Sequence, residues 1–149
     1  MAQPQDATDA TAQAATVPGW SQICTDGTCQ VQRSLTEKNS GRHFMSLSVV
    51  LHKDQPGVGI ALVLPLGIAL QDGVALGGGR DFRTLPILTC TPDGCLAEIA
   101  LDPVSLDLFA SQDQITVSFS PYGAEKIDIP MPLTGLPEAL TAARAELDG

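Results

Sequence analysis

The chain has 149 residues, enough for one domain and a tail; 44% of them are hydrophobic and only 4% are aromatic. This composition supports a globular core built mainly from aliphatic side chains. Acidic residues outnumber basic ones by 17 to 8, which gives a formal net charge of −9. Such a charge repels phosphate backbones and anionic lipids, so it argues against nucleic acid as a partner and against electrostatic membrane binding. The longest apolar run, 58–70, is broken by Pro65 and is shorter than the roughly 20 residues of a transmembrane helix.

The N-terminal segment, residues 1–18, is rich in alanine, glutamine, threonine and aspartate. Such a segment cannot bury enough surface to offset the entropy of ordering it. We therefore expect residues 1–18 to form a disordered tail and residues 19–149 to form one domain. Because a secretory signal needs an apolar core of roughly 7–15 residues, we expect this tail to begin a mature chain whose signal peptide has been removed.

From Trp20 onward, short β-prone segments alternate with turn signals. The first two, 20–24 and 29–35, flank an Asp-Gly pair that is typical of a two-residue hairpin turn. In 43–52, apolar residues fall at every second position and predict one buried face. Residues 58–65 are apolar on both faces, which predicts a central strand covered on both sides. Further strands are expected at 74–76, 85–90, 95–101, 115–119 and 127–131.

The prolines of the last of these segments, Pro130 and Pro132, place it at a sheet edge or outside the ladder, because proline cannot donate a backbone hydrogen bond. Two short helices are also expected. One begins with Asp102 as N-cap and Pro103 at the first helical position, and the other runs from Pro137 to Leu147 with one apolar stripe. Many short strands with little helix predict an all-β fold, a β-sandwich with one or two short helices, one of them C-terminal.

The four cysteines form two units of identical spacing. If Asp26 and Gly27 form the first turn, Cys24 lies directly opposite Cys29, at a Cα separation of about 4.5 Å that suits a disulfide. The second unit brackets a Thr-Pro-Asp-Gly turn, whose register the spacing alone leaves open. We therefore expect the disulfides Cys24–Cys29 and Cys90–Cys95, with four thiolates around one zinc ion as the main alternative. Disulfides imply an oxidising compartment.

Three segments are distinctive when taken together with Trp20, which stands just before the first cysteine pair. They read Pro-Leu-Gly-Ile-Ala-Leu at 65–70, Cys-Thr-Pro-Asp-Gly-Cys-Leu-Ala-Glu at 90–98 and Ile-Pro-Met-Pro-Leu-Thr-Gly-Leu at 129–136. Over about residues 20–147 this pattern resembles the invasion-associated locus B (IalB) family. The resemblance implies an immunoglobulin-like β-sandwich exported by a Gram-negative bacterium, in a family named for a role in host-cell entry, and it transfers no catalytic residue. The stretch 77–81, Gly-Gly-Gly-Arg-Asp, departs from the family's more charged pattern and predicts a mobile loop.

Residues that could carry a function are few. Four basic residues close together in the sequence form a candidate interaction patch for an anionic partner: Arg33, Lys38, Arg42 and Lys53. The two histidines, His43 and His52, are an odd number of residues apart on one predicted strand, so they face opposite sides and do not suit a shared metal site. The glycines at 77–79 lack the Lys-Ser/Thr of a phosphate loop, and no Gly-x-Ser-x-Gly elbow of a hydrolase occurs. Trp20 is expected to pack in the core.

These observations predict an exported, non-catalytic protein, periplasmic, secreted or at the cell surface, that acts through contact with another protein, including host-cell association. The alternative is a periplasmic protein that binds a small molecule or a metal in a pocket at the end of the sandwich near 77–79. No cofactor, nucleic acid or transmembrane segment is expected. The sequence is silent on the identity of the protein partner and on the oligomeric state.

Overall fold

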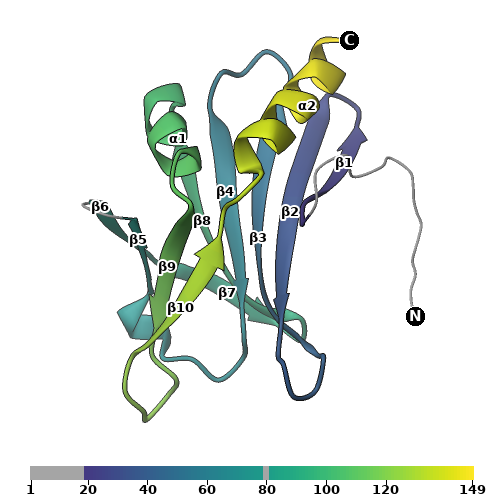
Figure 1. Ribbon diagram of the computed structural model, residues 1–149. Coiled ribbons are helices and arrows are strands. Elements are labelled where there is room, and N and C mark those ends of the chain that lie inside the picture. Colours follow the sequence, from purple (N-terminus) through teal and green to yellow (C-terminus); the bar gives the residue numbers. More distant parts are fainter. Residues whose placement is uncertain (1–18, 79–80) are drawn as a thin grey trace.

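The computed structural model describes residues 19–78 and 81–149, so the tail predicted for residues 1–18 lies outside the described residues. Within the described part, two antiparallel sheets pack face to face and two helices lie on the same side as the smaller sheet (Figure 1). The predicted all-β, immunoglobulin-like sandwich with a C-terminal helix is confirmed.

The larger sheet has the strand order β1-β2-β3-β4-β8-β7, and the smaller sheet has the order β10-β9-β5-β6. The strands of the larger sheet are β1 (Ser21–Thr25), β2 (Thr28–Thr36), β3 (His43–His52), β4 (Val58–Leu64), β7 (Ile87–Thr91) and β8 (Gly94–Leu101). Those of the smaller sheet are β5 (Val74–Gly78), β6 (Asp81–Leu85), β9 (Gln114–Phe119) and β10 (Ile127–Pro132). The helices are α1 (Pro103–Ala110) and α2 (Leu136–Asp148), and a short 3-10 turn (Leu70–Asp72) precedes β5.

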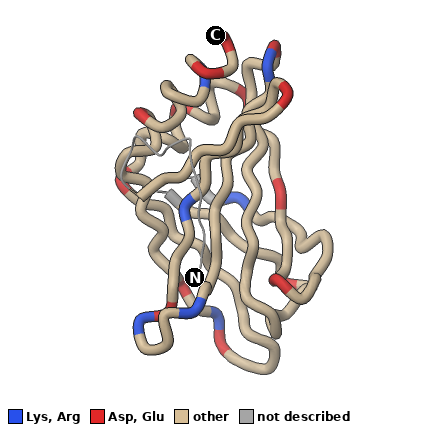
Figure 2. Tube along the Cα trace, turned by 90° about the vertical axis from the view of Figure 1, so that its right-hand side faces the viewer, with Lys and Arg blue, Asp and Glu red and all other residues tan. Residues whose placement is uncertain are grey.

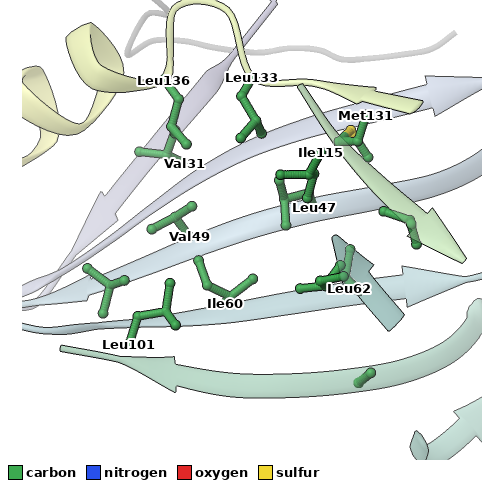
Figure 3. Close-up of a cluster of buried hydrophobic side chains, with 14 of the residues drawn as sticks. Val31, Leu47, Val49, Ile60, Leu62, Leu101, Ile115, Met131, Leu133 and Leu136 are labelled. Carbon is green, nitrogen blue, oxygen red and sulfur yellow. The ribbon is translucent and has the colours of Figure 1, made fainter. Parts of the chain in front are cut away.

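The hydrophobic core fills the space between the two sheets. Met45, Leu47, Val49 and Leu51 of β3 are at most 1% exposed, which confirms the alternation predicted for this strand. Figure 3 shows side chains of the larger sheet meeting those of β9, β10 and the connection to α2. Its labelled residues are Val31, Leu47, Val49, Ile60, Leu62, Leu101, Ile115, Met131, Leu133 and Leu136.

A β-bulge at the start of β3 was not predicted. Leu35 pairs with Met45 and Thr36 pairs with His43, so Phe44 is an extra residue on β3. Because a bulge breaks the strict alternation of faces, Phe44 turns toward the smaller sheet, where its ring centroid lies 6.4 Å from that of Phe119. The contact joins the two sheets at the end of the sandwich that carries the β2–β3 loop.

Two sequence-based expectations about strands are wrong. β4 is central, but its second face is not covered, because Gly59, Ala61 and Val63 remain half-exposed while the alternate residues are buried. The sequence of this face is apolar because its side chains are small, and not because a second layer packs against it. The strand expected at 85–90 is divided by Pro86, with Leu85 ending β6 in one sheet and Ile87 starting β7 in the other. Proline cannot supply the donor that a continuous ladder needs there.

The two helices lie at the same end of the sandwich (Figure 1). α2 packs against β1, β2 and β3, and its buried residues Leu136, Ala139, Ala143 and Leu147 confirm the predicted stripe, with Leu140 half-buried beside it. α1 begins as predicted, since the Oδ1 atom of Asp102 accepts a hydrogen bond of 2.7 Å from the backbone N–H of Ser105. That hydrogen bond lowers the pKa of Asp102 below its usual value of 3.8, because it favours the charged carboxylate.

Candidate functional site

Both disulfides are closed with the predicted pairing. Cys24 lies directly opposite Cys29 and Cys90 directly opposite Cys95, each pair with a Cα separation of 4.0 Å. In the first hairpin Asp26 and Gly27 both adopt positive φ, as a type I′ turn requires. No cysteine is free, so the four-thiolate zinc site is not formed.

The strand order gives the two disulfides a common role. Cys24 lies on β1 and Cys90 on β7, which are the two edge strands of the larger sheet, whereas Cys29 and Cys95 are buried on the adjacent strands. Edge strands are held on one side only and are the first to fray or to pair with another chain. Each disulfide therefore fixes one edge of the six-stranded sheet to its neighbour.

Removing either disulfide is expected to lower the free energy of unfolding by about 2 kcal/mol, because each closes a short loop. The variants are the double substitutions C24A/C29A and C90A/C95A, and urea unfolding measures the change. Alkylation without a reductant is expected to label no thiol in the wild-type protein. A wild-type protein that is labelled, or whose unfolding is unchanged by reductant, would contradict the pairing.

Trp20 and Arg33 form a contact that the sequence did not predict. Trp20 is 3% exposed, which confirms its expected place in the core, and its Nε1–H donates to the carbonyl oxygen of Thr134 at 2.9 Å. The Arg33 guanidinium carbon lies 5.4 Å from the centroid of the Trp20 ring, and its Nη1 donates to the carbonyl oxygens of Pro132 and Thr134 at 3.3 Å each. Arg33 is thus occupied in holding the connection between β10 and α2.

The four basic residues proposed as one patch are not brought together. Lys38 and Arg42 lie in the loop before β3, whereas Lys53 follows β3, whose 10 residues separate the two positions by roughly 30 Å. Lys53 instead lies beside the first hairpin turn, where its N–H donates to the carbonyl oxygen of Gly27 at 2.8 Å. These residues are close in the sequence but far apart in space, because the extended strand β3 places its two ends at opposite ends of the sandwich.

The two histidines have no shared site either. His43 and His52 are exposed at opposite ends of β3. The Nδ1 of His52 lies 3.0 Å from the Oγ1 of Thr28, and its carbonyl oxygen accepts a hydrogen bond of 3.2 Å from Arg144 of α2. These contacts assign His52 to the packing of β2, β3 and α2. Across residues 19–78 and 81–149, no cluster of three or more histidine, cysteine or acidic side chains is arranged to hold a metal ion.

The outer face of the larger sheet, hereafter the open face, carries mostly uncharged side chains. Both helices and the smaller sheet lie on the opposite face, and none of the described elements covers this one (Figure 1). Glu98 is the only charged residue in its three central cross-strand rows. These rows are Ile23–Gln30–Val50–Gly59–Ala100, Ser21–Gln32–Ser48–Ala61–Glu98 and Ser34–Ser46–Val63–Leu96–Thr89.

The charge distribution of the molecule makes the open face distinct. In Figure 2 the coloured charged residues are concentrated toward the two ends of the sandwich, and the strands between them are largely tan. On the face itself, Gln30 Nε2 donates to Ser48 Oγ at 3.0 Å and to Gln32 Oε1 at 3.2 Å, so the polar side chains are held by one another. The pattern of Gln, Ser, Ala and Gly at alternate strand positions was the sequence signal that could have revealed this face.

A pocket lies at another place, between the two sheets beneath α1. Its apolar lining comes from β4, β8, β5, β9 and α1, and its polar lining from Arg83, Ser105 and Gln112, around a cavity of about 120 Å³. Gly77, from the glycine-rich segment singled out in the sequence, is part of the lining. Of the other two glycines of the predicted loop, Gly78 ends β5 rather than forming a loop, and Gly79 lies outside the described residues.

These features define a disulfide-braced, two-sheet β-sandwich with an open face on its larger sheet and a pocket at the margin of its core. A model of the family described as "Invasion associated locus B (IalB) protein" matches residues 12–144. The chain belongs to this family, as its distinctive segments predicted.

The fold is also that of a solved structure. The crystal structure of invasion associated protein B from Bartonella henselae superposes with a TM-score of 0.83 at 24% sequence identity. The match covers 93% of this chain and 100% of that chain, so the two share the whole sandwich. No curated protein matches this chain in sequence. None of the helices in the described part of the chain is long and apolar enough to span a membrane.

Proposed function

We propose that this protein is an exported, non-catalytic binding module that contacts another protein through its open face. The observation that carries the proposal is the near absence of charge on this face in a chain of net charge −9. Protein interfaces are depleted of charged residues at their centre and contain direct hydrogen bonds between polar groups. The partner that fits is therefore a folded protein that presents neutral polar and small apolar side chains.

The rigidity of the larger sheet supports the same proposal. Disulfides fix both of its edge strands, and the hydrogen bonds among Gln30, Gln32 and Ser48 hold the polar side chains in place. A surface that is already ordered loses little conformational entropy on binding, so more of the contact energy appears as affinity.

Export is supported by the two disulfides, which persist in the periplasm or outside the cell and are rare in the cytosol. We place the protein in the periplasm or at the surface of a Gram-negative bacterium. The name of the Bartonella henselae neighbour, invasion associated protein B, makes proteins of a host-cell surface one group of partners to test.

The non-catalytic part of the proposal is supported by the places of the ionisable groups. The lowered pKa of Asp102 follows from its role as the N-cap of α1, where the Ser105 N–H favours the charged carboxylate. His52 is held by Thr28 and Arg144, and His43 lies at the other end of β3.

A matched pair of lysine substitutions tests the open face. Ala61 lies at its centre between Ser48 and Glu98, and Ala124 lies in the exposed β9–β10 loop. In the native host, proteins cross-linked to the wild type are compared with those cross-linked to A61K and to A124K, which carry the same added charge. We expect one partner to be captured by the wild type and by A124K, and its yield to fall at least tenfold with A61K. Equal capture by all three, or no specific partner in the periplasm or on host cells, would contradict the proposal.

A further inference from the structure

The pocket beneath α1 is built by the ends of both sheets. On β8 the inward residues Ala97 and Leu101 are 0% and 8% exposed, but Ile99 between them is only half-buried because it lines the hollow. Leu76 of β5 forms the opposite wall, and Phe109 of α1 forms the roof. The hollow reaches the surface, since Leu108 in its lining is 54% exposed.

The register places one positive charge beside this apolar hollow. Arg83 of β6 is the cross-strand partner of Leu76, so its side chain leaves the sheet on the same side as that buried leucine. Arg83 is the only charged residue in the described lining, which contains no carboxylate. The nearby Asp102 carboxylate is held at the start of α1 by the Ser105 N–H, and the charge of Arg83 is a smaller cause of its lowered pKa. Ser105 and Gln112 add neutral hydrogen-bonding groups to the lining.

Volume and charge together define a class of ligand. A cavity of about 150 Å³ lined by Leu, Ile and Phe accepts benzene, so a volume of about 120 Å³ with an open mouth suits a phenyl ring or a short branched chain. A guanidinium at the rim pairs best with a carboxylate. We infer that this pocket binds a small amphiphilic carboxylate, with its apolar group between the sheets and its carboxylate at Arg83. This site is separate from the open face and does not depend on the proposed protein contact.

Three ligands that share one phenyl group test the preference for a carboxylate. Phenylacetate, 2-phenylethanol and 2-phenylethylamine are titrated into the full chain. Changes in backbone amide NMR shifts report both the affinity and the location of the binding site. We expect phenylacetate to bind with a dissociation constant of about 1 mM or lower, the alcohol more weakly and the amine most weakly. The net charge of −9 alone would favour the amine, so the expected order isolates the local effect of Arg83.

Three variants locate the site. R83Q is expected to weaken phenylacetate binding about tenfold or more and to leave the alcohol within about twofold, since only the charge-assisted hydrogen bonds are lost. L108E changes an exposed position of α1 and is expected to weaken phenylacetate by repulsion. R42Q, in the distant β2–β3 loop, removes the same charge and is expected to change nothing.

Circular dichroism and thermal unfolding confirm that each variant is folded. No saturable phenylacetate binding at concentrations up to about 10 mM, tenfold above the expected dissociation constant, would overturn the inference. The inference would also be overturned if the amine bound most tightly and phenylacetate most weakly. Equal losses of phenylacetate affinity in R83Q and R42Q would overturn it as well. None of these three results would affect the cross-linking comparison of A61K and A124K.

Discussion

Replacing Trp20 with alanine is expected to lower the free energy of unfolding by about 3–5 kcal/mol, the usual cost of removing a large buried aromatic side chain. Trp20 is 3% exposed and hydrogen-bonds to Thr134, 114 positions away in the sequence. Its ring also supports the Arg33 guanidinium, which lies 5.4 Å from the ring centroid. The substitution would therefore leave a cavity, remove one of the two side-chain hydrogen bonds to the Thr134 carbonyl oxygen and deprive Arg33 of its packing surface.

Urea unfolding followed by circular dichroism measures this effect. W20F is the control, because it keeps most of the buried area but loses the indole N–H, and we expect it to cost about 1–2 kcal/mol. In the wild type, fluorescence of Trp20, the only tryptophan, reports unfolding at this contact itself. A W20A variant that loses less than about 1 kcal/mol, below the range for a buried aromatic, would show that the contact does not stabilise the domain. Equal losses in W20A and W20F would assign the whole effect to the hydrogen bond.

The Trp20 contact joins the N-terminal and C-terminal parts of the sandwich. Trp20 precedes β1, at one edge of the larger sheet, and Thr134 lies just before α2, which covers the inner face of β1 and β2. Arg33 reaches the same connection from β2. The first strand, the last strand and the last helix are thus joined at one point, and the Cys24–Cys29 disulfide holds the same hairpin a few residues away.

Local features of the fold followed from the sequence because short-range chemistry decides them. The Asp26-Gly27 turn requires two residues that tolerate positive φ, and this turn sets Cys24 opposite Cys29. Asp102 followed by Pro103 marks the start of α1 unambiguously. The period-two pattern in 43–52 gave the buried face of β3.

Features that depend on distant partners did not follow from the sequence. The segments before and after Pro86, β6 and β7, belong to two different sheets, and no local pattern in the sequence indicates this. The role of Arg33 depends on carbonyl groups about 100 positions away. Lys38 and Lys53 are close in the sequence and predicted one patch, but β3 separates them. The pocket also depends on long-range pairing, since the register of β5 and β6 directs Arg83 toward the apolar hollow.

Replacing Gly94 with alanine is expected to be the second severe change and to lower the free energy of unfolding by about 3 kcal/mol or more, since backbone strain and overpacking add. Gly94 begins β8 with φ of 141°, a conformation essentially restricted to glycine. An added Cβ would also lie 2.5 Å from the carbonyl oxygen of Leu64 and 2.8 Å from Cγ1 of Val63 on β4. The backbone of β4 cannot move away without breaking its pairing with β8, because Leu64 is paired with Cys95.

Gly123 provides the matched control for this prediction. It lies in the β9–β10 loop with φ of 77°, and a Cβ there would meet nothing within 4 Å. G123A therefore carries only the backbone cost of a positive φ, about 1–2 kcal/mol. The difference between G94A and G123A in urea unfolding measures the clash with β4. Equal losses of unfolding free energy in G94A and G123A would mean that the Cys90–Cys95 hairpin does not pack closely against β4.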